Sequence, residues 1–195
     1  MVSTTAVMDT QFTEQFKNFL NGETDAQTKE LREKAFAVFA ESGFPTPKVE
    51  DWKYTNVAQI AKEDWSIAPL SPDFSPTGEK SGQLLNDFNV QRSGFAALNV
   101  AFGQFQVIRI PKETVVDEPI ELIFSADQNT AIFPHILIIA EAGSKATIVE
   151  TYSSPGKSFT NTAIQLFVED NANLTHYRVQ KESENAFHEI GRAHV

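Results

Sequence analysis

The sequence predicts a mainly β chain with a helical region at its N-terminus. Three observations carry this prediction. Apolar residues follow a helical spacing up to about residue 62, short runs of high β-propensity follow each other after residue 95, and one seven-residue segment recurs 28 residues later. We therefore divide the chain into a helical region (1–67), a linker or long loop (68–94), a β region (95–188) and a tail (189–195).

Two helices and a shorter third one are expected in the helical region. The apolar stripe of the first consists of Phe12, Phe16, Phe19 and Leu20. The stripe of the second consists of Leu31, Ala35, Val38 and Phe39. Thr24 or Asp25 can cap this second helix, and Gly43 is placed to end it. The third helix is expected after Asn56, and its apolar residues are Val57, Ile60 and Ala61.

Residues 44–57, FPTPKVEDWKYTNV, predict a constrained corner. Pro45 and Pro47 fix their own φ angles and favour extended conformations for the residues before them. Trp52 and Tyr54 follow, and each has a large ring with a polar tip. We expect both rings to pack this corner onto the domain that follows.

The β region begins after a stretch, 68–83, whose prolines, glycines and serines are typical of an exposed loop. Strands are expected over 97–102, 104–110, 120–124, 135–140, 146–151, 163–168 and 174–179. Turn residues separate these runs.

An internal repeat restricts the architecture of the β region. Residues 141–147, EAGSKAT, align without gaps on residues 169–175, EDNANLT, and each copy lies between two apolar strands. A strand–turn–strand unit that recurs at this distance is typical of the stacked rungs of a β-helix. A sandwich of hairpins gives similar spacing, so the repeat alone leaves both architectures open.

Composition and charge exclude several function classes. The net charge is −10 and no basic cluster stands out, which argues against a nucleic-acid binder. The chain has no cysteine, so it cannot form disulfides, thiolate nucleophiles or cysteine-ligated metal sites by itself. The N-terminus lacks the features of a secretory signal, and the longest apolar run, 136–140, is too short to span a bilayer. We expect a soluble, cytoplasmic chain that binds neither nucleic acid nor membrane.

No catalytic, cofactor-binding or metal-binding residue is assigned from the sequence. Residues 156–158, Gly-Lys-Ser, resemble the end of a phosphate-binding loop, but Thr151 stands where that loop needs a glycine, so a turn between strands is expected. None of the four histidines has a partner at metal-ligand spacing. His135 and His176 lie within expected strands and are interpreted as packing residues.

Two acidic pairs lie in expected turns, Asp117 with Glu118 and Glu169 with Asp170. A carboxylate pair can serve a glycosidase, but acidic residues in turns are usually solvated. We expect solvated surface positions for both pairs.

The last six residues, 190–195, read as the in-frame translation of a sequencing-library adapter. On this interpretation Arg192 and His194 have no functional weight. The authentic chain is then expected to be a fragment that stops inside its β region, near Phe187 and His188.

Residues 43–57, GFPTPKVEDWKYTNV, resemble the N-terminal signature of the SufD branch of the SufB/SufD family of iron–sulfur cluster assembly proteins. Later segments fit the same family, namely LNVAF, VIRIPKE, EPIELIF, ATIVETY and NANLTHYRVQKESENAFH. The resemblance extends from about residue 10 to residue 188, and the EDWKYT element favours the SufD branch over SufB. One departure is the Gly-Gln-Phe segment at 103–105, where the family often has Asp-Gly.

The resemblance implies helices at the N-terminus, then a right-handed parallel β-helix of which this chain would hold only the first rungs, and then a C-terminal helical region. It implies a non-enzymatic scaffold subunit that pairs with a SufB-like paralogue and with a SufC-like ATPase, the latter through a C-terminal region missing from this chain. The complex assembles an iron–sulfur cluster, but no cofactor is expected on this fragment.

Two other function classes stay open. A carbohydrate-active β-helix enzyme would need charged side chains gathered on one face of successive rungs. A β-solenoid interaction module unrelated to iron–sulfur assembly would need no such cluster.

Overall fold

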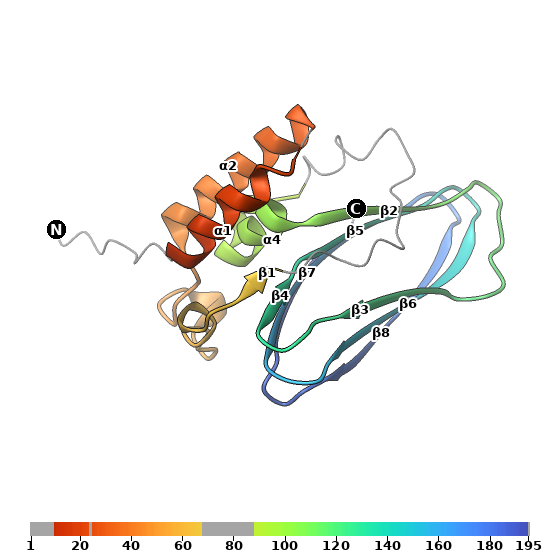
Figure 1. Cartoon of the computed structure of the whole chain (residues 1–195). Coiled ribbons are helices and arrows are strands. Elements are labelled where there is room, and N and C mark those ends of the chain that lie inside the picture. The colour runs from red at the N-terminus through yellow and green to blue at the C-terminus, as the bar shows by residue number, and fades with distance from the viewer. Residues whose placement is uncertain (1–9, 24, 68–87, 195) are drawn as a thin grey trace.

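The computed structural model describes residues 10–23, 25–67 and 88–194, with the side chains of 10 and 192–194 left out. Helices gather at one end of the molecule, and long strands extend away from them in two layers (Figure 1). The helices are α1 (Thr10–Leu20), α2 (Ala26–Ser42) and α4 (Gly94–Phe102), and the short 3-10 helices are η1 (Glu50–Trp52), η2 (Ile60–Lys62) and η3 (Val90–Arg92).

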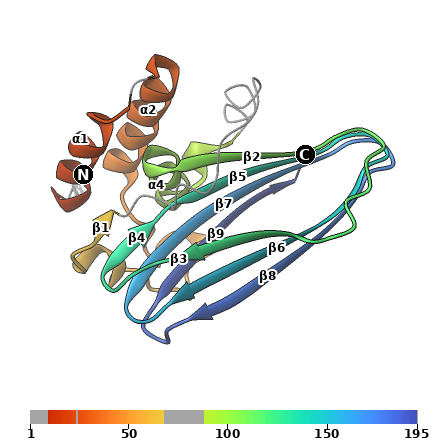
Figure 2. The same cartoon turned by 45° about the vertical axis from the view of Figure 1, so that its right-hand side comes forward.

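All strand pairs between the named strands are parallel, and they form two sheets. Sheet A contains β1 (Ser66–Ile67), β2 (Gln104–Ile110), β4 (Thr130–Ile132), β5 (Pro134–Ala140), β7 (Ser158–Val168) and β9 (Phe187–His194). Sheet B contains β3 (Ile120–Ser125), β6 (Lys145–Ser154) and β8 (Asn173–Glu182). The chain alternates between the sheets and so forms a β-solenoid of about three turns (Figure 2). The predicted fold class is confirmed.

The register of the sheets explains the repeat. Ile120 pairs with Ile148, and Lys145 pairs with Asn173, so residues 28 apart in sequence lie side by side in sheet B. The same offset relates β5 to β7 and β7 to β9 in sheet A. Parallel pairing at a constant offset excludes the sandwich of hairpins, whose strands would be antiparallel. One rung of the solenoid therefore corresponds to one repeat.

The repeated glutamates perform the same task in successive rungs. A carboxylate oxygen of Glu141 accepts a hydrogen bond from the backbone N–H of Lys112 at 2.9 Å. A carboxylate oxygen of Glu169 accepts one from the backbone N–H of Ala142 at 3.0 Å. Each glutamate thus ties its own turn to the turn of the preceding rung, and this contact accounts for its recurrence.

The strand predicted over 97–102 is wrong, because these residues form α4. The Ser93 hydroxyl caps the helix by accepting the backbone N–H of Ala96 at 3.2 Å. The helix is buried on all sides, so its run of apolar residues has no helical period, and such a run can be read equally well as a buried strand. Its glycine is required by packing, since a Cβ on Gly94 would lie 1.8 Å from the carbonyl oxygen of Gly43.

Helix α2 begins and ends near the predicted residues. The Asp25 side chain accepts the backbone N–H of Thr28 at 2.7 Å, and Gly43 follows the helix with φ +62°. The predicted stripe omits Arg32, which is buried and donates to the carbonyl oxygen of Ala101 at 3.1 Å. Arg32 therefore satisfies a carbonyl at the C-terminal end of α4 and fixes α2 against it.

Phenylalanine rings fill the junction between the helices and sheet A. Phe102 of α4 is buried and contacts five other rings, those of Phe12, Phe16, Phe19, Phe36 and Phe133. The third expected helix is shorter than predicted, since only the 3-10 helix η2 forms there. Val57 and Ile60 of its predicted stripe are buried, but Ala61 is exposed.

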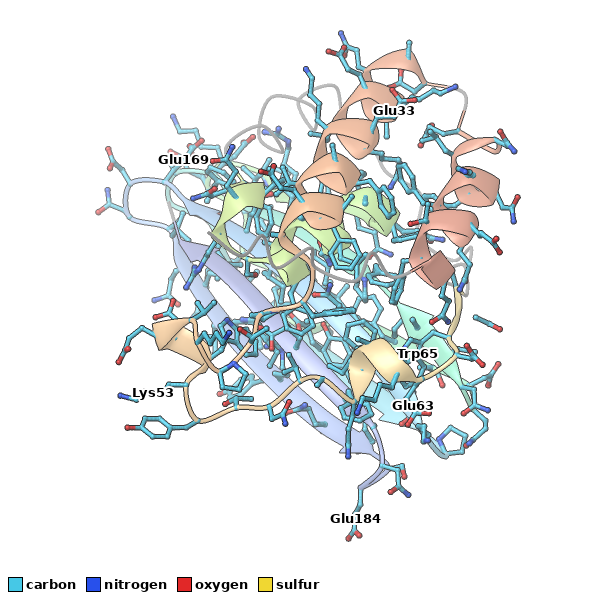
Figure 3. All side chains as sticks on the ribbon, turned by 90° about the vertical axis from the view of Figure 1, so that its left-hand side faces the viewer. Glu33, Lys53, Glu63, Trp65, Glu169 and Glu184 are labelled. Carbon is cyan, nitrogen blue, oxygen red and sulfur yellow. The ribbon has the colours of Figure 1, made fainter. Side chains whose placement is uncertain are left out.

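The corner at 44–57 is only partly as predicted. Trp52 is half-buried, and its ring lies 5.1 Å from the ring of Phe95. Tyr54 is 93% exposed, so the prediction that it packs inward is wrong. Because one 3-10 turn takes three residues, side chains two positions apart point in different directions, and only one of the two rings can face the core. Figure 3 shows the neighbouring Lys53 on the outside of the corner.

Three short or terminal strands, β1, β4 and β9, were not predicted. Residues 68–87 of the expected linker lie outside the described residues, while 88–94 contain η3 and the start of α4. The segment 189–194, interpreted above as an adapter-derived tail, forms all of β9 except its first two residues. Its pairing with β7 is made by backbone atoms, which almost any sequence can supply, so the strand gives no information on the origin of these residues.

Candidate functional site

The space between the two sheets, here called the lumen, changes chemistry along the solenoid. Apolar side chains from the first rungs fill most of it, including Leu122, Phe124, Ile136 and Ile148. Further along, several inward positions of β6, β7, β8 and β9 are polar or charged, while others on these strands, such as Ile164 and Leu174, stay apolar. This polar end of the lumen contains Glu150, Tyr152, Thr160, Thr162, His176, Arg178, Glu182 and His188.

Glu150 is the centre of the first cluster, and it is fully buried. Its Oε1 lies 2.5 Å from His176 Nε2, and its Oε2 accepts from Arg178 Nε at 3.0 Å and from the Tyr152 hydroxyl at 2.9 Å. The Tyr152 oxygen is also 2.9 Å from the Thr162 hydroxyl, which joins the cluster to sheet A.

These contacts determine the charge state of the carboxyl group. Burial alone would raise the pKa of Glu150, but the hydrogen bond from His176 and the positive charge of Arg178 outweigh it and hold the pKa below its usual range. Burial, with the nearby charge of Glu150, raises the pKa of Tyr152. A buried carboxylate is thus kept ionised by partners from the adjacent strand.

Glu182 is the centre of a second, neighbouring cluster. Its carboxylate accepts from the Thr160 hydroxyl at 2.9 Å and lies 2.6 Å from His188 Nδ1. Burial favours a higher pKa for Glu182, and the contacts with His188 and Thr160 lower it below the usual range. The His188 ring lies 4.6 Å from the ring of Tyr152, so the two clusters are in contact.

Sequence reasoning missed this site, although one signal was present. Glu150 and Arg178 are separated by one repeat length and are register partners in the pairing of β6 with β8. Thr160 and His188 are register partners in the pairing of β7 with β9. Applying the repeat offset to polar as well as charged residues would have found both pairs.

His135 occupies a different polar site, on the helix side of sheet A. It is fully buried, and its Nδ1 lies 2.7 Å from Asn99 Oδ1. The Asn99 amide group already donates to the carbonyl oxygens of Pro134 and Asn161, so Asn99 Oδ1 must accept from the ring. Burial lowers the pKa of His135 to about 4, and the ring is neutral at physiological pH. The predicted packing role is confirmed.

The remaining candidate residues from the sequence lie in turns and structural contacts rather than in a catalytic arrangement. Residues 155–157 form the bend between β6 and β7, as the turn interpretation predicts, and Lys157 Nζ pairs with Glu63 at 2.8 Å. Figure 3 shows Glu63 close to Trp65 beside η2. Asp117 and Glu118 are exposed, as expected. Glu169 is exposed too, but its carboxylate serves the structural contact with Ala142 described above.

Two surface grooves lie beside the junction. The larger, about 680 Å³, is lined by Trp52, Phe95, Arg92 and Glu189 among others, and it separates the corner from β7 and β9. The smaller, about 530 Å³, lies between η2 and the β8–β9 turn. Within the described part of the chain, no group of three or more histidine, aspartate or glutamate side chains could hold a metal ion. No helix in that part is both long and apolar enough to cross a membrane.

Two family models match the chain, one on each architectural region. The SufBD protein N-terminal region matches residues 6–80, and the SUF system FeS cluster assembly SufBD core domain matches residues 123–194. The two matches occur in the same order as the helical region and the solenoid. The chain belongs to the SufB/SufD family.

Two curated bacterial proteins are similar to this chain. An iron–sulfur cluster assembly SufBD family protein of Synechocystis is 29% identical over 123 residues, which cover 54% of this chain and 27% of the relative. The iron–sulfur cluster assembly protein SufD of Bacillus subtilis is 35% identical over 78 residues, which cover 38% of this chain and 18% of the relative. The chain thus spans about a quarter or less of the length of these relatives. No solved structure matches the chain.

Proposed function

We propose that this chain is part of a non-catalytic scaffold subunit of a cytoplasmic SUF-type complex that assembles iron–sulfur clusters. The subunit pairs with a SufB-like paralogue and with a SufC-like ATPase. The observation that carries the proposal is the match of both regions, helical and solenoid, to models of one iron–sulfur assembly family.

The side chains of the chain agree with a scaffold role. The charged residues of the lumen are buried and bonded to one another, so they are not presented to a substrate. A parallel solenoid that carries a helical cap on one sheet provides long, rigid strands, and rigid strands are suited to holding partners at fixed separations.

The proposal is tested by co-expression. The complete protein carrying an affinity tag is produced together with the SufB-like and SufC-like proteins of the same genome. We expect both partners to be retained on the affinity matrix after washing at 0.15–0.3 M salt, a range that screens non-specific contacts of an acidic chain.

The matched control is the same tag on a Phe102→Ala variant, whose helical region is expected to detach from the solenoid. Loss of partners with this variant, but not with Tyr54→Ala, would show that retention depends on the folded chain. Retention of neither partner by the unmodified protein contradicts the proposal and favours an interaction module outside iron–sulfur assembly.

A further inference from the structure

Asn21 and Gly22 form an exposed turn directly after α1, and they are the one Asn-Gly step in the sequence. An asparagine side chain can react with the backbone nitrogen of the residue that follows it, and a side chain on that following residue hinders the approach. Glycine has no Cβ, so the approach to the Gly22 nitrogen is open. The sequence and the exposed turn together make this step suited to attack of a backbone nitrogen on an asparagine amide.

The backbone hydrogen bonds of this turn are long. The N–H of Asn21 lies 3.3 Å from the carbonyl oxygen of Lys17. The N–H of Gly22 lies 3.2 Å from the carbonyl oxygen of Phe19. Both distances are at or beyond the upper end of the usual range, and the last turn of a helix opens more readily than its middle. Opening frees the Gly22 nitrogen and allows the Asn21 side chain to rotate towards it.

Other exposed asparagines in the described part of the chain lack this combination. Asn171 also lies in an exposed turn, but it is followed by Ala172. Asn56 is exposed and is followed by the β-branched Val57. In both places a Cβ stands next to the nitrogen that would have to attack. Asn171 is therefore a comparison site within the same molecule.

The reaction needs water and no other reactant. The Gly22 nitrogen forms a bond to Asn21 Cγ, the bond from Cγ to Nδ2 breaks, and ammonia leaves with the proton that the Gly22 nitrogen carried. The product is a five-membered succinimide ring, which water then opens. Addition of water at Cγ gives aspartate. Addition at the main-chain carbonyl carbon gives isoaspartate, in which the main chain runs through Cβ and Cγ and is one carbon longer.

Glu23, the next residue, links this turn to the junction between the helices and sheet A. Its Oε2 accepts from Arg32 Nε at 3.0 Å, and Arg32 Nη1 donates to the carbonyl oxygen of Ala101 in α4 at 3.1 Å. The Arg32 side chain is 7% exposed. Burial lowers the pKa of Arg32, and the hydrogen bond to Glu23 opposes this effect. A buried charge that loses its counter-charge is costly, so the position of Glu23 matters for the attachment of α2 to α4.

We propose that Asn21 is a site of spontaneous deamidation, and that its isoaspartate product weakens the ion pair between Glu23 and Arg32. The added main-chain carbon lies between α1 and Glu23, so it shifts the Glu23 carboxylate relative to Arg32. The aspartate product adds a charge but leaves the main chain as it is. The attachment of α2 to α4 thus weakens with the age of the protein.

Incubation of the purified protein at mildly alkaline pH tests the site. The tryptic peptide 18–29 is then sequenced by mass spectrometry, and isoaspartate is measured by enzymatic methylation of its carboxyl group. We expect the amide-to-acid mass change and isoaspartate at Asn21 well before any change at Asn171. Equal modification of the two residues overturns the proposal. So does an intact Asn21 in the protein when the free peptide 18–29 is modified under the same conditions.

Gly22→Ala is the matched variant. A Cβ on Gly22 would lie 3.5 Å from the carbonyl oxygen of Phe19, which is an ordinary contact, and Gly22 is not among the residues with positive φ. The fold should therefore tolerate alanine here. We expect Asn21 to keep its amide in this variant through the same incubation, and modification at the original rate contradicts the proposal.

Urea unfolding before and after incubation measures the consequence. We expect the midpoint to fall with the isoaspartate content, to stay constant in Gly22→Ala, and to be nearly unchanged by Asn21→Asp, which adds the charge without the carbon. In Glu23→Gln the ion pair is already broken, so isoaspartate should cause little further fall. A full fall in Glu23→Gln, an equal fall in Asn21→Asp, or no fall in the original sequence would overturn the coupling to Arg32.

Discussion

The chain buries two interiors of opposite chemistry. The junction between the helices and sheet A is built mainly from phenylalanine rings, and the polar end of the lumen from two carboxylates, two histidines and an arginine. The hydrophobic effect is non-directional, so the stability of the junction depends on how much buried apolar area a substitution removes. Buried charges cost several kcal/mol unless each is paired and hydrogen-bonded, so the lumen responds to a single lost partner. The stability of the junction thus depends on how well its side chains fill space, and the stability of the lumen depends on how its charged groups are paired.

The largest loss is expected from Phe102→Ala in the junction. Phe102 is 1% exposed and contacts rings from α1, from α2 and from the segment at Phe133. Removing it should cost about 3–5 kcal/mol of the free energy of unfolding, because a cavity remains where the helices meet the sheet. Urea unfolding followed by circular dichroism measures this. The half-buried Phe36→Ala is the control, and an equal loss there would mean that the junction is not centred on Phe102.

In the lumen, Glu150→Gln is expected to cost about 3 kcal/mol although the shape is almost unchanged. The amide leaves the Arg178 guanidinium buried without a counter-charge, and a broken buried ion pair is more costly than an absent one. Denaturant unfolding at pH 7 gives the value. Glu121→Gln, on the exposed outer face of β3, is the control and should stay within about 0.5 kcal/mol. Equal effects would mean that the lumen behaves like a solvated surface.

Replacing the charged residues of the Glu150 cluster together tests the same difference between the two interiors. In the triple variant Glu150→Met, His176→Leu and Arg178→Met, no buried charge of the first cluster is left unpaired. Its stability should recover most of the loss seen in Glu150→Gln, since apolar groups of similar volume often replace buried ion networks without cost. A triple variant less stable than the single one would show that the network itself stabilises the solenoid.

The junction also contains one polar exception, His135, whose titration separates the two interiors. Its pKa in the folded chain is about 4, against 6.5 in the unfolded chain. The unfolded state therefore takes up a proton that the folded state refuses, and stability falls as the pH drops from about 6.5 towards 4. The expected loss is roughly 3 kcal/mol over this window. Comparing unfolding free energies of the protein and His135→Gln across pH 7–4.5 measures it, and identical slopes would contradict it.

The two lumen carboxylates affect stability at lower pH than His135 does. Because their pKa values are depressed in the folded chain, Glu150 and Glu182 contribute stability that is present above the ordinary carboxyl pKa of 4.5 and is lost as the pH falls below it. Above about pH 4.5, His135 lowers stability as the pH falls, and Glu189 opposes this loss because burial raises its pKa to about 7; below pH 4.5 the lumen carboxylates add to the loss.

The difference between the interiors also decides how much the sequence could predict. The apolar stripe of α1 and the strands of the solenoid follow from residue spacing, since apolar side chains reveal the buried face. Helix α4 has apolar residues on every side and gave no such signal. In β8 the pattern misleads, because Tyr177 is 58% exposed while His176 and Arg178 face the lumen. Here the register of the repeat, rather than polarity, fixes which side chains point inward.

The smallest effect on stability is expected at Tyr54, which lies in neither interior. Its ring is 93% exposed, so Tyr54→Ala should change the free energy of unfolding by no more than about 0.5 kcal/mol, whereas Trp52→Ala removes a ring packed on Phe95 and should cost more. Both variants are measured by urea unfolding. If Tyr54→Ala is stable and still retains both partners in the co-expression assay, the exposed ring is dispensable. If it is stable but loses a partner, Tyr54 is a contact residue, since a side chain that stabilises nothing within the chain can affect assembly only through its own surface.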